Sequence, residues 1–394
     1  MYIDRFDSGL TCYIDNNEYL TLFALIIKAG SVYEQKDKSG ISHFLEHMHA
    51  FVAQNIPYDN MAALEPLNYA YTNFYETVYV FVKREVGNDT DFITRCRNTI
   101  GSIFNKNFLT EALFTKIKND VLEEYKHTDF SKDSALKQLF YNEPYPLPIG
   151  ELKCIQDLKY SDIISYHDKQ YLIENAAVVV ISNADKNFVI DSLSGQYANI
   201  KFDFLPFITS VPCKKFNINE DDSIYFLSKY KRVLESAEQY ITDMLCLRFA
   251  SDSLADIIYN YFIEKNIYVS ASGLFEILSK HWHIFKLRIN FNNPNEIPAC
   301  LEYIIKNFTL TNKTFEKIKT AFSQELTAHP QGNSFHLLDE YINNFLFDEP
   351  IFNINDEINY IQSSLKRINF DMVVKKFNAI LLNLVIFPKS YVEI

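Results

Sequence analysis

Residues 39–52 read SGISHFLEHMHAFV, and this stretch decides how the first part of the chain folds. Apolar side chains recur in it at the spacing of one helix face. They are Ile41, Phe44, Leu45, Met48, Phe51 and Val52. The spacing predicts a helix that opens at Ser39-Gly40, buries its apolar face and leaves the other face for polar side chains.

The polar face of this predicted helix carries a metal-binding pattern. His43 and His47 are four residues apart, so both rings project from one face, and Glu46 lies on the same side. Two imidazoles beside a carboxylate suit a zinc site with an adjacent base, in the H-x-x-E-H order that inverts the commoner H-E-x-x-H. The alternative is a polar helix face that carries two histidines by coincidence.

A catalytic zinc site needs three protein ligands and one open position, so a third ligand must come from elsewhere in the chain. The acidic pair Glu123-Glu124 lies on the next well-formed predicted helix, for which Thr110 is the expected N-cap. In this chemistry a water molecule attacks a peptide carbonyl near neutral pH. We expect Glu46 to take its proton and pass it to the leaving amine.

Strand patterns surround the helix in the first half of the chain. Residues 10–14 and 19–28 read as two strands joined by a polar turn. Residues 69–83 alternate and are rich in β-formers, and residues 176–182 are a nearly continuous Val/Ile run. The first half therefore predicts a sheet packed against helices.

The second half repeats this order coarsely after a break in the pattern. We predict a zinc-bearing domain over residues 1–205, a linker over 206–222 and a homologous domain without a zinc motif over 223–394. The predicted elements of the second domain are a strand near 225–227, a helix over 237–262, strands over 267–276 and 282–291, and helices over 296–307, 313–328 and 333–347. The expected fold class is α+β, with two similar α/β domains whose antiparallel-rich sheets pack against helices.

The net charge and the cysteine content restrict which partners and which cellular location the sequence predicts. The net charge is −12 and no basic stripe is present, which argues against nucleic acid as a partner and favours basic peptides. The longest apolar run, Leu20–Ile27, is too short to span a membrane. The six cysteines form no C-x-x-C pair, and the N-terminus lacks the pattern of a signal peptide. We therefore expect reduced thiols and a cytoplasmic location, with no membrane partner.

The motif from His43 to Met48, preceded by Gly40, resembles that of the pitrilysin/insulinase-type inverzincin metallopeptidases. The resemblance implies Zn²⁺ as cofactor, with Glu46 as catalytic base. In that family a glutamate in a Val-x-x-Glu-Glu-type helix follows the second histidine by about 76 positions, and it is the third ligand. Glu123 lies 76 positions after His47, so the resemblance implies His43, His47 and Glu123 as ligands, with Glu124 as runner-up.

The family also binds substrate as an added strand beside the zinc, along an Asn-Ala-x-Thr strand that is followed by Thr-x-Tyr. The matching residues here are Tyr69-Ala70-Tyr71-Thr72 and Thr77-Val78-Tyr79. Tyr69 occupies the asparagine position, and Asn68 lies one residue early. The resemblance therefore implies Asn68, Ala70 and Thr72 as substrate-binding residues.

The chain length is similar to one subunit of the mitochondrial-processing-peptidase-like branch, in which two such chains form a clamshell. Members of this kind place an Arg and a Tyr opposite the zinc, but the matching positions here are Ile263 and Ser270, with Tyr268 two residues early. The resemblance thus implies a zinc endopeptidase for extended peptides, leader or precursor peptides among them, working as a heterodimer whose homologous partner supplies Arg and Tyr. The alternatives are a non-catalytic structural subunit and a metal- or peptide-binding chaperone.

Overall fold

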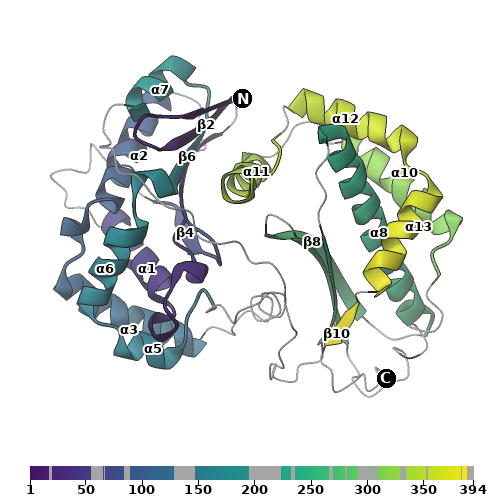
Figure 1. Cartoon of the computed structure of the whole chain (residues 1–394), viewed down its shortest axis with the longest axis horizontal. Helices are drawn as coiled ribbons and strands as arrows, with labels where there is room; N and C mark the ends of the chain where they lie inside the picture. Colours follow the sequence, from purple (N-terminus) through teal and green to yellow (C-terminus); the bar gives the residue numbers. More distant parts are fainter. Residues whose placement is uncertain are drawn as a thin grey trace. The chain divides into compact units, whose positions relative to one another are not determined.

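The structure is a computed structural model of the chain, and it forms two compact units (Figure 1). Unit 1 comprises Met1–Lys215 with Asn333–Leu346, and unit 2 comprises Phe216–Gly332 with Phe347–Ile394. The residues that the structure describes are 1–16, 20–54, 65, 67–83, 89–127, 147–194, 223–231, 236–265, 269–279, 282–291, 302, 309–328, 334–351, 354–382 and 384–387. The predicted linker over 206–222 lies outside them.

Unit 1 is built on a six-stranded sheet with the strand order β1-β2-β6-β3-β5-β4. The strands are β1 (Tyr2–Arg5), β2 (Thr11–Asp15), β3 (Thr21–Ile27), β4 (Tyr69–Thr72), β5 (Thr77–Lys83) and β6 (Ala176–Ile181). Only β2 and β6 pair in parallel; the other pairs are antiparallel. Every residue of β3 and β6 is buried, which is why these two strands read as continuous apolar runs.

Helices pack on one face of this sheet and enclose the core of unit 1 (Figure 1). They are α1 (Ile41–Gln54), α2 (Asp89–Ile103), α3 (Glu111–His127), α5 (Leu152–Asp157), α6 (Tyr160–Gln170) and α7 (Lys186–Ser194). Short 3-10 turns lie at Ser31–Tyr33, Lys36–Lys38, Lys106–Phe108 and Ile173–Asn175. The predicted cap of α3 is confirmed, because the backbone N–H of Leu113 donates to Thr110 Oγ1 at 3.2 Å.

A distant segment, α11 (Ser334–Phe347), contributes to unit 1 on the other face of the sheet. Alternate residues of a strand face opposite sides, so Cys12 belongs to the helical core while Tyr13 points away from it. Tyr13 stacks on Tyr341 with ring centroids 5.1 Å apart, and the Tyr341 hydroxyl donates to Asp15 at 2.6 Å. A helix over this segment was expected, but as part of the second domain, whereas the structure groups it with unit 1.

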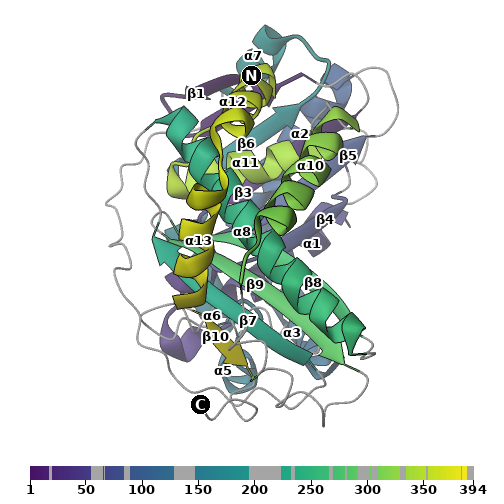
Figure 2. The same ribbon diagram turned by 90° about the vertical axis from the view of Figure 1, so that its right-hand side faces the viewer.

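Unit 2 carries a four-stranded antiparallel sheet with the order β10-β7-β9-β8 (Figure 2). The strands are β7 (Ser223–Lys231), β8 (Val269–Ser279), β9 (Trp282–Phe291) and β10 (Val385–Phe387). The helices are α8 (Ala237–Glu264), α10 (Asn312–Ala328), α12 (Ile354–Arg367) and α13 (Phe370–Leu382). The long helix α8 is capped by Ser236, whose Oγ accepts the N–H of Gln239 at 3.2 Å.

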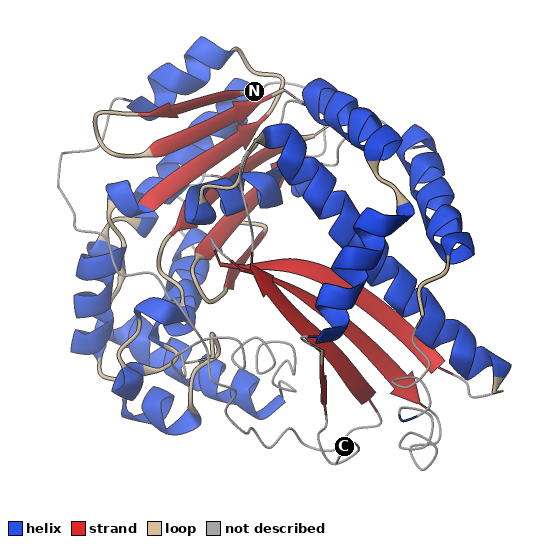
Figure 3. Cartoon of the chain, turned by 45° about the vertical axis from the view of Figure 1, so that its right-hand side comes forward, coloured by secondary structure: helices blue, strands red, loops and turns tan. Residues whose placement is uncertain are grey.

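Both units therefore combine a sheet with packed helices, and the predicted α+β class is confirmed (Figure 3). The expected helix over 296–307 lies outside the described residues except at Glu302, which is helical. None of the helices in the described part of the chain is long and apolar enough to cross a membrane.

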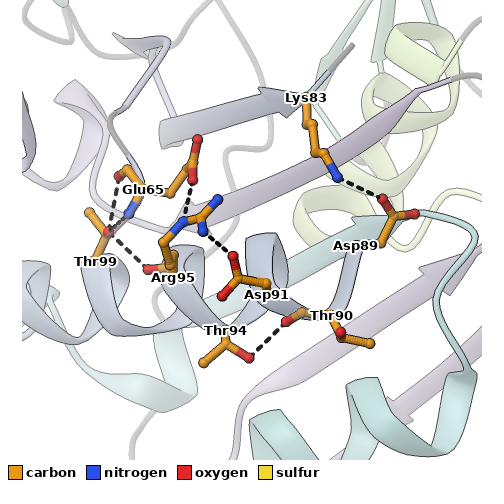
Figure 4. A network of polar contacts seen from close by, with 8 residues as sticks. All are labelled: Glu65, Lys83, Asp89, Thr90, Asp91, Thr94, Arg95 and Thr99. Carbon is orange, nitrogen blue, oxygen red and sulfur yellow. Dashed lines mark hydrogen bonds and ion pairs between the residues drawn. The ribbon is translucent and has the colours of Figure 1, made fainter. Parts of the chain in front are cut away.

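A polar network ties helix α2 to the chain that precedes strand β4 (Figure 4). Arg95 Nε donates to the Glu65 carboxylate at 2.8 Å, and Thr99 Oγ1 both donates to the Glu65 carbonyl and accepts its N–H at 3.0 Å. Lys83, at the end of β5, pairs with Asp89 at the start of α2 at 3.4 Å. These contacts fix α2 beside the two strands that border the site described below.

Two glycines meet back to back at the start of α1. Gly40 and Gly150 have φ angles of +92° and +82°, a region that suits glycine. A Cβ built on Gly150 would lie 2.3 Å from the Gly40 Cα and 2.6 Å from the Ser39 carbonyl oxygen. Only two residues without side chains allow this close approach, which fixes where α1 begins.

Gly150→Ala is predicted to destabilise unit 1, because the new Cβ meets backbone atoms and the φ angle is strained. The expected loss is about 2–5 kcal/mol from strain and overpacking together. Gly101→Ala is the matched control: its Cβ meets nothing within 4 Å in helix α2, and we expect a gain of about 0.5–1 kcal/mol. Urea unfolding measures both, and a Gly150→Ala protein as stable as the wild type would contradict the prediction.

Candidate metal centre

The N-terminus of α1 is held by a carboxylate that the sequence analysis missed. Glu34 accepts the backbone N–H of Gly40 at 2.8 Å and that of Ser42 at 2.9 Å. Burial raises the pKa of Glu34 to about 8, while these donors act in the opposite direction. The Ser42 hydroxyl also hydrogen-bonds the Tyr166 hydroxyl on α6 at 2.8 Å. Glu34 precedes the helix by six positions or more, outside the usual spacing of a cap, so no sequence pattern marked it.

Ligand atoms of His43, His47 and Glu124 converge between α1 and α3. His43 Nε2 and His47 Nε2 lie 3.0 Å apart on one face of α1, as the four-residue spacing predicts. Glu124 Oε2, from α3, lies 3.0 Å from His47 Nε2 and 3.8 Å from His43 Nε2. Within the described residues these three side chains can offer ligand atoms that all lie within 4.8 Å of one another.

This arrangement favours Glu124, the runner-up, over Glu123 as the third ligand. Glu123, the first choice from the sequence, is exposed, while the runner-up Glu124 is half-buried beside the histidines. The helical periodicity of α3 indicates which of the two glutamates faces α1. Glu124 follows the buried residues Val121 and Ile117 by three and seven positions, so it shares their face toward α1.

The protonation states suit metal binding. Burial, and then the neighbouring His47, lower the pKa of His43 to about 4, which leaves its ring neutral at pH 7. The hydrogen bond with His47 keeps the pKa of Glu124 below its ordinary value, so this carboxylate is ionised. Burial acts to lower the pKa of His47, but the bond to Glu124 and nearby carboxylates outweigh it and raise the pKa. The ionised Glu124 beside the neutral His43 ring thus makes the cluster favourable for a bound cation.

The donor set fits a zinc ion. Tetrahedral ligands at about 2.0–2.1 Å from zinc are roughly 3.3 Å apart, close to the 3.0 Å and 3.8 Å separations seen here. The two Nε2 atoms face each other at 3.0 Å, and once both are unprotonated a cation at that point satisfies both lone pairs. Two imidazoles and one carboxylate are also the ligand types that zinc accepts together.

Glu46 lies beside this cluster with its carboxylate buried. Its side chain is 7% exposed, and its Oε2 accepts the hydroxyl of Thr72 on β4 at 3.1 Å. Burial raises the pKa of Glu46 to about 7, while the charge of His47 and the bond from Thr72 lower it. A carboxyl group whose pKa is near neutral can both take up and release a proton under physiological conditions.

The predicted substrate strand β4 forms the edge of the sheet beside α1. Among described residues it pairs only with β5, in a register that places Ala70 opposite Tyr79 and Thr72 opposite Thr77. The Asn68 side chain accepts the N–H of Val82. Ala70 and Thr72 therefore lie on an edge with hydrogen-bonding groups available, while the Asn68 amide oxygen already binds the sheet. Their roles toward substrate stay predictions.

Residues 12–149 match the family model of insulinase (Peptidase family M16). This match confirms, for that part of the chain, the resemblance seen in the sequence. An uncharacterised zinc protease of Rickettsia felis is 29% identical over 50% of this chain and 50% of its own length. A zinc protease PQQL-like of Arabidopsis thaliana is 22% identical over 93% of this chain.

The chain spans about half the length of these curated relatives, or less: 39% in the Arabidopsis case. Among solved structures, the periplasmic protease PqqL of Escherichia coli superposes with a TM-score of 0.76 at 16% identity, over 97% of this chain and 46% of that one. The first half of the same protease, solved alone, gives 0.76 over 97% and 89%. The whole chain thus has the fold of one half of such a protease.

Glu124→Gln is predicted to weaken zinc binding by about 100-fold or more, because an ionised ligand becomes a neutral amide. Glu123→Gln is the matched control, one position away on the same helix and exposed. Zinc titration followed by elemental analysis measures both proteins. Equal zinc retention in the two variants would refute the assignment of Glu124.

Proposed function

We propose that this chain is a zinc-dependent endopeptidase subunit that hydrolyses peptide bonds in extended peptides. The observation that carries the proposal is the convergence of His43, His47 and Glu124 beside the buried carboxylate of Glu46. The match of residues 12–149 to the insulinase family model and the relatives named zinc proteases support both the metal and the reaction. Zinc, when bound, supplies Lewis acidity at this point.

The side chains divide the chemistry between them. His43, His47 and Glu124 hold the ion by two neutral nitrogens and one carboxylate oxygen. Glu46 acts as general base: Oε2 is engaged by Thr72, which leaves Oε1 to accept a proton from the attacking water and to return it to the leaving amine. Burial of this carboxylate removes competing water and gives it a basicity suited to neutral pH.

The edge of β4 offers a place for an extended substrate. A peptide that added to this edge would form main-chain hydrogen bonds along Ala70 and its neighbours, beside the metal centre. The net charge of −12 favours basic peptides by long-range attraction. Leader or precursor peptides with basic segments fit this description, so peptide processing is the proposed role.

A second homologous subunit is part of the proposal. Ile263, at the expected arginine position, is an exposed apolar residue on the last turn of α8, and it donates no side-chain hydrogen bond. Ser270 is the second residue of β8, and Tyr268 lies outside the described residues. The Arabidopsis relative and the Escherichia coli protease are about twice as long or longer, which supports a need for a second half. That partner would supply the Arg and Tyr groups that stabilise the carbonyl oxyanion.

A non-catalytic structural or peptide-binding subunit is the alternative. A Pseudomonas fluorescens protein named as an inactive domain of peptidase M16 shares the fold with a TM-score of 0.69 at 13% identity. The fold alone is therefore compatible with either role, and the grouping of His43, His47, Glu124 and Glu46 supports the catalytic one. The cytoplasmic location stays a prediction, since the Escherichia coli neighbour is named periplasmic.

Glu46→Gln is predicted to keep zinc and lose hydrolysis. The amide has the same shape but cannot take a proton from water, so we expect a fall in kcat of about 10²–10⁴-fold or more. Cleavage of a quenched-fluorescence peptide library, with zinc content measured on the same samples, provides the test. A zinc-loaded variant that cuts as fast as the wild type would exclude Glu46 as the base.

The chain purified alone is predicted to cleave peptides roughly 10²–10³-fold more slowly than with its partner, the usual effect of a missing oxyanion donor. Replacing Ile263 by Arg tests whether this position can supply the group in part. Turnover is measured on the same peptide library with and without the homologous subunit. Full turnover by the chain alone would refute the need for a partner.

A further inference from the structure

A buried line of hydroxyl groups runs from the core of unit 1 to the carboxylate of Glu46. Thr72 Oγ1 lies 3.1 Å from Glu46 Oε2 and 3.2 Å from Thr77 Oγ1. The Tyr171 hydroxyl hydrogen-bonds Thr77 and lies 3.0 Å from the Tyr79 hydroxyl. These residues come from α1, β4, β5 and the chain that follows α6, so the line joins four separate segments.

Counting protons fixes the direction of the hydrogen bond to Glu46. An ionised carboxylate only accepts, so Thr72 must donate its single hydroxyl proton to Glu46. The Thr72 oxygen is then left as an acceptor, 3.2 Å from the Thr77 hydroxyl, whose single proton also lies within reach of the Ala29 carbonyl at 3.2 Å. The hydroxyls of Tyr171 and Tyr79 are paired at 3.0 Å, and either of them can be the donor.

The line is anchored where the protein is most rigid. Thr77 is fully buried, and its hydroxyl also lies 3.2 Å from the backbone carbonyl of Ala29 at the end of β3. The Tyr171 ring packs against two buried histidines, with centroids 4.9 Å from His49 and 5.1 Å from His167. Tyr171 can therefore not turn its hydroxyl away without disturbing the core.

We propose that Thr72 is a positioning residue that aims the Glu46 carboxylate, and that Thr77, Tyr171 and Tyr79 hold Thr72 in place. The inference rests on the proposed function, in which Glu46 is the base. One carboxylate oxygen is fixed by Thr72, so the other is directed toward the metal centre. The resemblance assigned Thr72 to substrate binding; here its side chain serves Glu46, while its backbone on β4 stays available to a peptide.

The first test compares Thr72→Val, which keeps the side-chain shape without the hydroxyl, with Thr72→Ser, which keeps the hydroxyl. For the library peptide that the zinc-loaded wild type cuts fastest, with the partner subunit present if needed, we expect kcat to fall roughly 10- to 100-fold in Thr72→Val, the worth of one hydrogen bond to a charged group. KM and zinc content should change little, and Thr72→Ser should restore kcat. Crystal structures of both zinc-loaded variants should show the Glu46 carboxylate turned only in Thr72→Val.

The second test removes an upstream hydroxyl. Tyr171→Phe should lower kcat without loss of zinc, even if Thr72→Val fails to fold. Tyr160→Phe is the matched control, because its hydroxyl donates to the Leu109 carbonyl at 2.6 Å and has no part in the line. Equal kcat in both tyrosine variants would overturn the extension of the line beyond Thr77.

The outcomes separate this inference from the proposed function. An active wild type with unchanged kcat in Thr72→Val, or an unmoved Glu46 in its crystal structure, would overturn the positioning role alone. A rise in KM with kcat unchanged would assign the Thr72 side chain to substrate binding instead, and overturn it too. A zinc-loaded wild type that cleaves no peptide, with the homologous subunit present, would overturn the proposed function itself.

Discussion

The hydrogen bond between His47 and Glu124 joins α1 to α3, and the candidate metal centre depends on it. The two atoms lie 3.0 Å apart, and they bring a carboxylate from one helix to the histidine pair of another. The helix start fixed by Glu34 and by the Gly40–Gly150 contact sets the position of His43 and His47 along α1. Without that fixed start the rings would not meet the glutamate from α3.

Local patterns predicted the parts of the fold that are local in origin. Apolar spacing placed α1 and α3, and the continuous apolar runs placed β3 and β6, because these signals need only neighbouring residues. The helices α2, α6 and α13 were not expected, although apolar residues recur at helix spacing on one face of α2 (Ile93, Cys96, Ile100) and of α13 (Val373, Phe377, Ile380). They form because the sheet and the long helices bury those faces.

The candidate site likewise has a part that local patterns predict and a part that depends on tertiary contacts. The proximity of His43, Glu46 and His47 could be predicted from the sequence, because a single helix turn brings them together. The choice of Glu124 over Glu123 depends on which face of α3 meets α1, and this is a tertiary relation. The line of hydroxyl groups behind Glu46 joins four segments of the chain, and the docking of α11 on Tyr13 joins residues more than 300 positions apart. No local pattern could have predicted either.

Anomalous X-ray diffraction at the zinc edge, on crystals of the chain soaked with zinc, tests the central claim most directly. The account predicts one strong peak bonded to His43 Nε2, His47 Nε2 and Glu124 Oε2, with the Glu46 carboxylate near the ion but turned toward the open position. A peak bonded to Glu123, a peak at another place in the chain, or no peak at these histidines would contradict it.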